Sequence, residues 1–315
     1  MALILNCYHF EFRHILGGLS IPKKPESRCP REGFMRIKFW GTRGSIAVPG
    51  KDTILYGGNT TCLEITLESG RVIIIDAGTG IRPLGDKLSA ESDTLDVHLL
   101  ITHIHWDHVL GFPYFGPLYK SSTHLKIDGY PTCMNGLRNT FDNRMGDGFF
   151  PVKFADLKAK ITYLETLRHG ALEVDGTVIS SSPLHHPQGG FGFRFKEGSK
   201  TFVFMTDNEL RKDGWKGRNP KDYAKFCKDA DILVHDSQYT PGEIDDRRDW
   251  GHSDYGAAFA LADKANVKRL ILTHHDPART DLQVTSLTMG CKALARAKSS
   301  GMVIEAAAEM SELEL

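Results

Sequence analysis

Short apolar runs recur along the chain, and a histidine or an aspartate follows each run at its downstream end. Runs rich in β-branched residues and leucine are typical of strands that are buried on both faces. Five of them lie at 97–101, 177–184, 201–205, 231–235 and 268–273. Helical patterns lie between or after them, at 220–227, 253–265 and 281–298. The sequence therefore predicts an α/β protein.

The first of these runs leads into the densest group of possible metal ligands. His103, His105, Asp107 and His108 stand within six positions, directly after the strand 97–101. Desolvating three histidines and a carboxylate together is costly unless they pair with each other or coordinate an ion. Their spacing is that of a zinc ligand signature, and open α/β sheets keep their sites at the carboxyl ends of strands. The sequence predicts a metal site here rather than a structural histidine cluster.

Other stretches of the sequence predict what surrounds this site. Leu99–His103 and Leu270–His274 are near copies, which indicates two similar halves that face each other across one site. Asp76 is better placed to accept a hydrogen bond from a ligand histidine than to be a ligand itself. The loop Gly41–Ser45 lacks a phosphate-binding fingerprint and is expected to form a tight turn near the site. Val109–Lys120 is expected to be helical.

Composition limits the class of protein. The 315 residues are 41% hydrophobic, which is enough for a substantial core. Lys plus Arg and Asp plus Glu both number 39, so the chain lacks the basic excess of an extensive nucleic-acid surface. The six cysteines form no C-x-x-C pair, and no stretch approaches the roughly 18 apolar residues of a membrane span. We expect a cytoplasmic protein with reduced thiols and no membrane partner.

Residues 1–34 are expected to lie outside the fold, as an N-terminal extension, because Met35 opens the first convincing strand. Residues 35–315 are then expected to form one domain. A chain that starts at Met35 should keep the activity and the melting temperature of the full chain. A large loss of either quantity, measured on the two chains side by side, would show that the extension belongs to the fold.

The motif His103-x-His105-x-Asp107-His108, followed later by single His, Asp and His residues, resembles the ligand motif of the metallo-β-lactamase superfamily. The resemblance extends from residue 35 to about residue 310. It implies a four-layer αβ/βα sandwich, with two mixed sheets, helices outside and a dinuclear metal site. Within the superfamily, the chain is most similar to the phosphodiesterase branch that includes ribonuclease Z and the cyclic phosphate hydrolases. The stretches that carry this similarity are 183–186, 191–195, 234–236 and 251–253.

Carried over position by position, the resemblance implies seven ligands. The first metal ion would bind His103, His105 and His186, the second would bind Asp107, His108 and His274, and Asp207 would bridge them. Adjacent residues of an extended segment face opposite sides, so only one of His185 and His186, and one of His274 and His275, is expected to reach the site. The resemblance favours His186 and His274, and the other two remain open alternatives.

Two features of the sequence restrict which substrate of the superfamily we expect. Position 207 is an aspartate where β-lactamases of the common type have a cysteine ligand, so antibiotic hydrolysis is not expected. Ribonuclease Z carries a long tRNA-grasping arm between the ligands that match His186 and Asp207, but only 21 positions separate them here. Together with the neutral charge balance, this favours a small phosphodiester. The candidates are a cyclic nucleotide, a cyclic phosphate and a short oligonucleotide.

The chemistry follows from the ions. Two metal ions about 3.5 to 4 Å apart can generate a metal-bound hydroxide near neutral pH and hold the phosphate oxygens while it attacks in line. In the phosphodiesterase branch, a histidine of a His-Ser-Thr segment protonates the leaving alkoxide and an acidic residue holds that histidine. This implies His252 and Asp236 as catalytic residues, together with the ligand Asp107. The threonine of that segment is Asp254 here, and Ser253 or Asp254 could simply cap the following helix.

Two other functions fit the same ligand set. One is a thioester or lactone hydrolase of the same fold, and the other is a non-catalytic metal-binding protein. Histidine and carboxylate ligands suit zinc, manganese and iron, and we take zinc first. Trp106, Phe149, Phe150 and Tyr239 could stack a base or belong to the core. Relatives in this branch often pair, so a homodimer is compatible with the resemblance.

Overall fold

The computed structural model describes residues 35–132, 145–146, 148, 150–210 and 219–315. The N-terminal segment 1–34 and Phe149 lie outside the described residues, so what the sequence predicts for them stays a prediction. Within the described part of the chain, no helix is both long enough and apolar enough to cross a membrane.

Seven strands form the first sheet, in the order β14-β1-β2-β3-β4-β5-β6. Pairing is antiparallel from β14 to β3 and parallel from β3 to β6, so the sheet is mixed. The carboxyl ends of the parallel strands therefore meet at one edge. The strands are β1 (Arg36–Gly41), β2 (Cys62–Thr66), β3 (Val72–Ile75), β4 (Leu95–Ile101), β5 (Thr123–Gly129), β6 (Lys160–Tyr163) and β14 (Glu312–Glu314).

The second sheet also has seven strands, in the order β13-β12-β11-β10-β9-β8-β7. Pairing is antiparallel from β7 to β10 and parallel from β10 to β13. The strands are β7 (Leu172–Val174), β8 (Thr177–Pro183), β9 (Phe191–Glu197), β10 (Lys200–Met205), β11 (Ile232–Asp236), β12 (Arg269–Thr273) and β13 (Val303–Ala306).

The two sheets repeat one pairing pattern, three antiparallel pairs followed by three parallel pairs, which agrees with the expectation of two similar halves. The near-copied segments Leu99–His103 and Leu270–His274 do not occupy equivalent places, however. β4 is the second strand of its parallel set, whereas β12 is the third of its own. Their likeness therefore reflects a common local requirement, a buried parallel strand that ends in a histidine.

An apolar core fills the space between the two sheets. Because strand residues alternate between faces, Phe202 and Phe204 of β10 join Phe39 of β1 in this core. Val203 and Met205 of the same strand lie in another cluster, on the face that the helices cover. β10 is thus buried on both faces, as its unbroken apolar sequence predicts.

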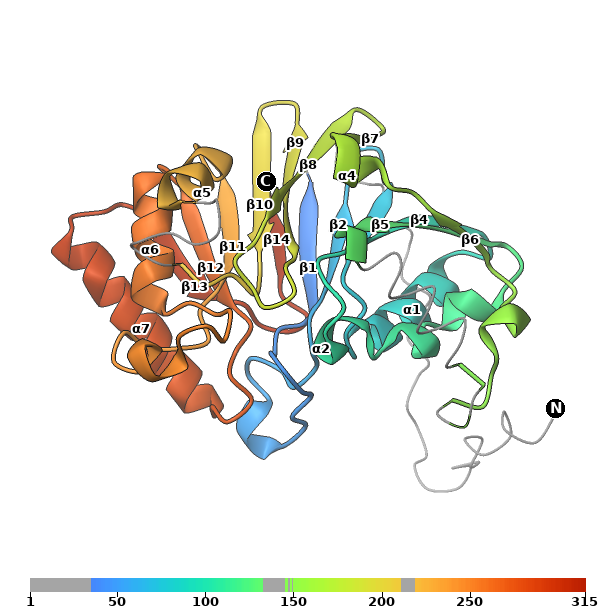
Figure 1. The fold of residues 1–315 in the computed structure, drawn as a ribbon, viewed down its shortest axis with the longest axis horizontal. Helices are drawn as coiled ribbons and strands as arrows, with labels where there is room; N and C mark the ends of the chain where they lie inside the picture. Colours follow the sequence, from blue (N-terminus) through green and yellow to red (C-terminus); the bar gives the residue numbers. More distant parts are fainter. Residues whose placement is uncertain (1–34, 133–144, 147, 149, 211–218) are drawn as a thin grey trace, which may run out of the picture. The chain divides into compact units, whose positions relative to one another are not determined.

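Helices cover the outer face of each sheet and complete four layers (Figure 1). α1 (Ile81–Glu91) buries Ile81, Leu84 and Leu88, which helical spacing places on one face, against the first sheet. The second sheet is covered by α5 (Pro220–Phe226), α6 (Tyr255–Lys264) and α7 (Asp281–Ala297). The predicted four-layer sandwich with two mixed sheets is confirmed.

The expectation of a helix over Val109–Lys120 is wrong. α2 (Trp106–Val109) ends where that helix should begin, and two 3₁₀ turns follow. Pro113 and Pro117 stand in these turns and lack the N–H that a continuing helix needs. The short helical elements are η2 (Phe112–Tyr114), η3 (Gly116–Tyr119), η1 (Lys51–Thr53), η4 (Phe154–Asp156), η5 (Ile244–Arg247) and α4 (Thr166–His169).

Candidate metal centre

The predicted ligands lie just beyond the ends of β4, β8, β10 and β12, and Asp236 is the last residue of β11. Two of them, Asp207 (φ 53°) and His274 (φ 58°), have left-handed backbone conformations, as does Asp76 (φ 60°) after β3. Residues other than glycine rarely adopt this conformation, and such strain gathers at functional sites. The chain thus turns immediately after these strands, at the positions of the polar side chains.

The seven predicted ligands form two groups. One group is His103, His105 and His186, and the other is Asp107, His108, Asp207 and His274. Within each group the possible ligand atoms all lie within 4.8 Å of one another. Side chains that are far apart in the sequence therefore meet as the resemblance implies. Their assignment as ligands stays a prediction.

Asp207 lies between the two groups. Its Oδ1 is 3.8 Å from Nε2 of both His103 and His186 and 3.2 Å from Nε2 of His274. Its Oδ2 is 3.2 Å from Nε2 of His108. One carboxylate thus faces both groups of side chains, which is the position a bridging ligand needs.

Every histidine of the set has one ring nitrogen beside an acceptor of the protein. The pairs are His103 Nδ1 with Thr102 Oγ1 (3.1 Å), His105 Nε2 with Gln188 Oε1 (2.8 Å), His108 Nδ1 with Asp76 Oδ2 (2.7 Å), His186 Nδ1 with the Gly251 carbonyl (3.1 Å) and His274 Nδ1 with Gln238 Oε1 (3.1 Å). Partners of this kind fix the ring orientation and the tautomer of metal-binding histidines. The second nitrogen of each ring is left for the cluster, and Asp76 has the accepting role expected of it.

The ring nitrogens that face the cluster are better placed to bind a cation than to accept a hydrogen bond from the protein. Among the described residues, Nε2 of His103 and Nε2 of His108 are buried without a hydrogen-bond partner. Burial lowers the pKa of His103 well below its usual value, so this imidazole is neutral and keeps its lone pair. Burial would raise the pKa of Asp207, but His274, His108 and His103 together hold that pKa well below its usual range. Neutral imidazoles around an ionised carboxylate form the donor set that divalent cations bind.

His108 has the opposite shift. Burial would lower its pKa, but Asp107, Asp207 and Asp76 outweigh burial and raise the pKa well above its usual value. A proton on His108 therefore balances the surrounding carboxylates. A divalent cation at the same place would supply that positive charge and leave the imidazole neutral for coordination. The buried His/Asp cluster is thus typical of metal binding in composition and in electrostatics.

The two neighbouring histidines have other partners. His185 Nδ1 lies 2.9 Å from the Glu209 carbonyl, and His185 groups with Glu209 and Asp249 rather than with the main cluster. His275 Nε2 donates to the Ala307 carbonyl at 2.8 Å. In each pair, one ring lies with the main cluster and the other is held by a backbone carbonyl. The geometry therefore favours His186 and His274 as ligands, as the resemblance does.

The loop at Gly44 passes directly over the cluster. The Ser45 N–H donates to Asp107 Oδ2 at 2.7 Å, and a Cβ placed on Gly44 would overlap the imidazole of His274. Gly44→Ala should therefore displace His274 and weaken metal binding about 10- to 100-fold, the usual effect of losing a ligand's support. Gly50→Ala is the matched control, because a Cβ there meets nothing within 4 Å. Titration with zinc measures both, and equal affinities would refute the close approach.

His252 and Asp236 lie beside the cluster. His252 Nδ1 donates to Asp236 Oδ2 at 3.0 Å, and its ring stacks on that of His274 with centroids 4.9 Å apart. Burial would lower the pKa of His252, but the hydrogen bond to Asp236 and the charges of Asp236 and Asp207 raise it to about 9. His252 is within reach of the cluster's carboxylates, so it could act as a ligand or as a proton donor. Its protonated state near neutral pH fits a donor.

The residues that follow His252 have structural roles that do not compete with this one. Asp254 caps α6, since its side chain accepts from the N–H groups of Gly256 and Ala257. Ser253 donates its N–H to Asp236 Oδ1 at 2.8 Å and its hydroxyl to the Asn208 carbonyl. Asp254 therefore caps the helix while Ser253 holds Asp236, and neither role prevents His252 from acting as a proton donor.

Sequence reasoning missed several supporting residues. Arg43 is fully buried and donates to the Gly57, Asp276 and Arg279 carbonyls, which ties the Gly41–Ser45 loop to the chain after His274. Gln188 and Gln238 are hydrogen-bonded to the predicted ligands His105 and His274, but no motif marks these glutamines. Only the strand-like context of the ligands is visible in the sequence, and it does not say which distant side chains meet them.

The aromatic candidates divide between surface and core. Trp106, beside the ligands, is 68% exposed, whereas Tyr239 is buried against His252, with ring centroids 6.1 Å apart. Phe150 is half-buried and packs edge to face on Tyr114. Of the three described candidates, Trp106 therefore has the ring that is open to solvent, whereas Tyr239 and Phe150 pack within the protein.

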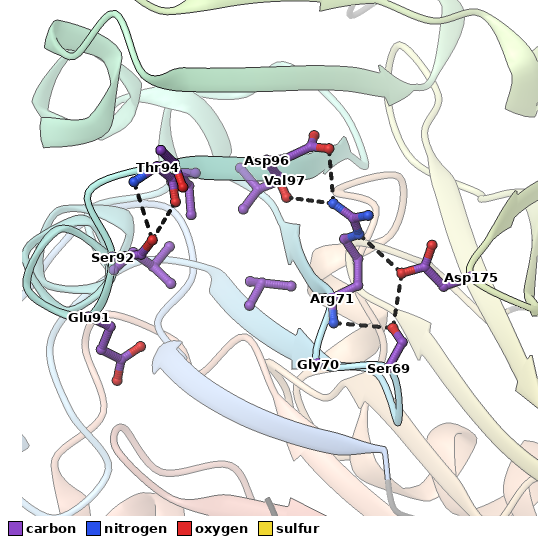
Figure 2. Close-up of a pocket in the computed structure, with 12 residues that line it drawn as sticks. Ser69, Gly70, Arg71, Glu91, Ser92, Thr94, Asp96, Val97 and Asp175 are labelled. Atoms are coloured by element: carbon purple, nitrogen blue, oxygen red, sulfur yellow. Dashed lines mark hydrogen bonds and ion pairs between the residues drawn. The ribbon is translucent and has the colours of Figure 1, made fainter. Parts of the chain in front are cut away.

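A hollow of about 350 Å³ lies at the starts of β3 and β4, at the opposite end of these strands from the cluster. Figure 2 shows Arg71 bound to both Asp96 and Asp175. Arg71 pairs with Asp96 at 2.9 Å and with Asp175 at 3.2 Å, and Ser69 donates to Asp175. Because the arginine is already neutralised by these partners, we assign no function to this hollow.

Comparisons with known proteins agree with the geometry. The β-lactamase superfamily domain matches residues 71–275. Ribonuclease Z of Staphylococcus haemolyticus is 25% identical over 284 residues, covering 76% of this chain and 88% of the relative. The match to the superfamily domain includes residues 103–108 and the ends of β4, β8, β10, β11 and β12.

Two solved structures share the fold. YhfI of Bacillus subtilis, a metallo-β-lactamase fold protein, superposes with a TM-score of 0.66 at 16% identity and covers 90% of this chain and 99% of its own. Yeast PDE1 superposes with a TM-score of 0.63 at 14% identity and covers 90% and 99%. The superfamily resemblance of the ligand motif is thereby confirmed, and the chain belongs to the β-lactamase superfamily.

Proposed function

We propose that the protein is a metal-dependent hydrolase that cleaves a small phosphodiester. The observation that carries this proposal is the pair of ligand groups that meet at Asp207, with the hydrogen-bonded pair of His252 and Asp236 beside them. Hydrolysis of a diester needs a nucleophile, neutralisation of the phosphate charge and a proton for the leaving alkoxide. The site offers residues for all three.

The donor set fits two divalent ions, of which zinc is our first choice, with manganese and iron also compatible. The proposed ligands are His103, His105 and His186 for one ion and Asp107, His108 and His274 for the other, with Asp207 shared. Ions bound there would supply a hydroxide nucleophile near neutral pH and would neutralise the phosphate oxygens. Asp107 is fixed for this purpose by the Ser45 N–H.

His252 is the proposed general acid. Its Nδ1 is committed to Asp236, so Nε2 is the atom that can donate a proton to the leaving alkoxide. Asp236 is itself fixed by the N–H groups of Ser253 (2.8 Å) and Asn208 (3.2 Å). A positioned acid of this kind contributes about 10²- to 10⁴-fold to the rate.

A small substrate is proposed because the chain between His186 and Asp207 contains only a turn and the hairpin β9–β10. The relatives named above include a ribonuclease and a phosphodiesterase, and we carry phosphodiester chemistry over from them as part of the proposal. Thioester and lactone hydrolysis remain the second candidate, since the same metal centre attacks carbonyl groups.

Activity assays separate these candidates. The purified protein, with its native metal kept and its metal content measured, should hydrolyse bis(p-nitrophenyl) phosphate and should leave S-lactoylglutathione intact. Turnover of the thioester alone would replace the proposal by its alternative. A metal-loaded protein without activity on either would indicate a metal-binding role.

A cytoplasmic location also belongs to the proposal. Cys62, Cys227 and Cys291 are buried free thiols, which is typical of a reducing compartment. Burial raises the pKa of Cys227 and of Cys291 to about 12, so these thiols are inert at neutral pH. A homodimer remains part of the prediction, and its oligomeric state can be measured by light scattering.

A further inference from the structure

A loop beside His252 carries an arginine without a matching anion. The loop connects β11 to α6 and includes η5, which ends at Arg247. The guanidinium carbon of Arg247 lies 5.2 Å from the ring centroid of Trp250 and 6.0 Å from that of Tyr239. These cation–π contacts orient the guanidinium, but they satisfy none of its N–H donors with a hydrogen-bond acceptor.

Most acidic residues of the same loop have other partners, and Asp254 caps α6. The exposed Asp246 forms no ion pair with Arg247 among the described residues. Glu243 Oε2 pairs with Arg279 Nη2 at 2.5 Å, and Asp245 Oδ1 pairs with Arg248 Nη2 at 2.7 Å. Asp249 has an interaction of its own as well. In the described part of the chain, Arg247 forms no ion pair and no hydrogen bond through its side chain. Its positive charge is therefore available to a ligand.

Tyr239 connects Arg247 to the proposed proton donor. Its ring contacts the guanidinium of Arg247 and lies with its centroid 6.1 Å from that of His252. The Tyr239 hydroxyl is buried and has no hydrogen-bond partner among the described residues. Since His252 protonates the leaving alkoxide in the proposed reaction, the leaving half of the substrate lies on the side of the site where Arg247 stands.

We infer that Arg247 binds a second anionic group, a terminal phosphate on the leaving half of the substrate, and this inference rests on the proposed function. In the hydrolysis, the oxygen of water bonds to phosphorus, and the bond from phosphorus to the leaving 3′-oxygen breaks. A proton passes from His252 to that oxygen, the water gives up a proton to the solvent, and the solvent returns one to His252. A guanidinium pairs with a phosphate through two parallel hydrogen bonds. Trp250, 58% exposed beside it, offers a surface on which a base can stack. The substrate class is a short oligonucleotide with a 5′-phosphate.

The first test compares two dinucleotides that differ only in a terminal phosphate. They are adenylyl-(3′→5′)-adenosine and the same molecule with a 5′-phosphate. The metal-loaded wild type should show a kcat/KM at least about tenfold higher for the phosphorylated substrate, as expected for one charge-assisted pair. Arg247→Gln should lower this ratio to about one. The ratio for Arg247→Lys should lie between these two values, because lysine keeps the positive charge but cannot form two parallel hydrogen bonds with the phosphate.

Arg248→Gln is the matched control, because it removes a neighbouring arginine that is already paired with Asp245. It should keep the wild-type ratio. An unchanged ratio in Arg247→Gln, or an equal fall in Arg248→Gln, would overturn the inference.

A binding measurement keeps the inference testable if the protein cleaves no dinucleotide. Calorimetry with adenosine 5′-monophosphate and with adenosine gives a ratio of affinities that does not depend on turnover. We expect Arg247→Gln to reduce this ratio at least about tenfold, the effect of losing one charge-assisted hydrogen-bonded pair. A ratio in Arg247→Gln equal to the wild-type value would refute the phosphate site. Inactivity on every diester, together with the expected fall of the ratio in Arg247→Gln, would refute the proposed function alone.

Discussion

Asp207→Asn is expected to lose bound metal and to reduce turnover of bis(p-nitrophenyl) phosphate by at least about 10³-fold, because the shared carboxylate of a dinuclear centre is removed. Asp207 lies within 3.8 Å of the ring nitrogens of four predicted ligands, so its charge acts on both groups at once. Asparagine tolerates the left-handed conformation at this position, where alanine would add backbone strain. The loss can therefore be attributed to the charge.

Asp175→Asn is a matched control for this experiment. Asp175 also has a left-handed conformation, with φ 46°, but it lies in the far hollow and pairs with Arg71. Its substitution should leave metal content and turnover at wild-type values. Metal content by elemental analysis and initial rates are measured on both variants. An Asp207→Asn protein that holds two ions and turns over normally would contradict the proposed bridging role.

His252→Ala is expected to keep both metal ions and to lose at least about 10²-fold in turnover of a diester with a poor leaving group. The reason is that an alkyl alkoxide must be protonated as it departs, whereas p-nitrophenolate is a stable anion that leaves with little need for a proton. The loss should therefore be far smaller for bis(p-nitrophenyl) phosphate. Unchanged turnover of the alkyl diester, with metal content verified, would remove the assignment. A loss of metal would instead make His252 a ligand.

The pH dependence gives a second readout of the same residue. The acid form of His252 is the active one, so activity on the poor leaving group should fall as the pH rises through the pKa of His252. Without metal ions this pKa is raised to about 9, and bound cations lower it because positive charges disfavour the protonated imidazole. The alkaline fall should be present in the wild type and absent from His252→Ala.

Much of this site could be predicted from the sequence because its ligands follow buried strands. The apolar runs predict the strands and the polar side chains at their ends. His103 follows a strand of the first sheet and His274 a strand of the second, so the superfamily resemblance, and not the edge of one sheet, is what placed them at one site. The motif of His103, His105, Asp107 and His108 after β4 indicated to which superfamily the chain belongs. The fold, the grouping of the seven side chains and the pair of His252 and Asp236 all agree with what the sequence implied.

The supporting contacts could not be predicted in this way. Gln188 and Gln238 reach ligand histidines from loops with no periodic pattern, and Arg43 acts through three carbonyl groups that any residue could supply. Arg247 is one of two consecutive arginines, and only the structure shows that Arg248 is ion-paired and Arg247 is not. These contacts depend on the tertiary packing of loops, which composition and spacing do not encode.

Anomalous diffraction from crystals of the metal-loaded protein tests the central claim most directly. The account predicts two peaks about 3.5 to 4 Å apart, one among His103, His105 and His186 and one among Asp107, His108 and His274, with Asp207 in contact with both. No peak in this cluster, or a metal ion bound elsewhere in the chain, would contradict it.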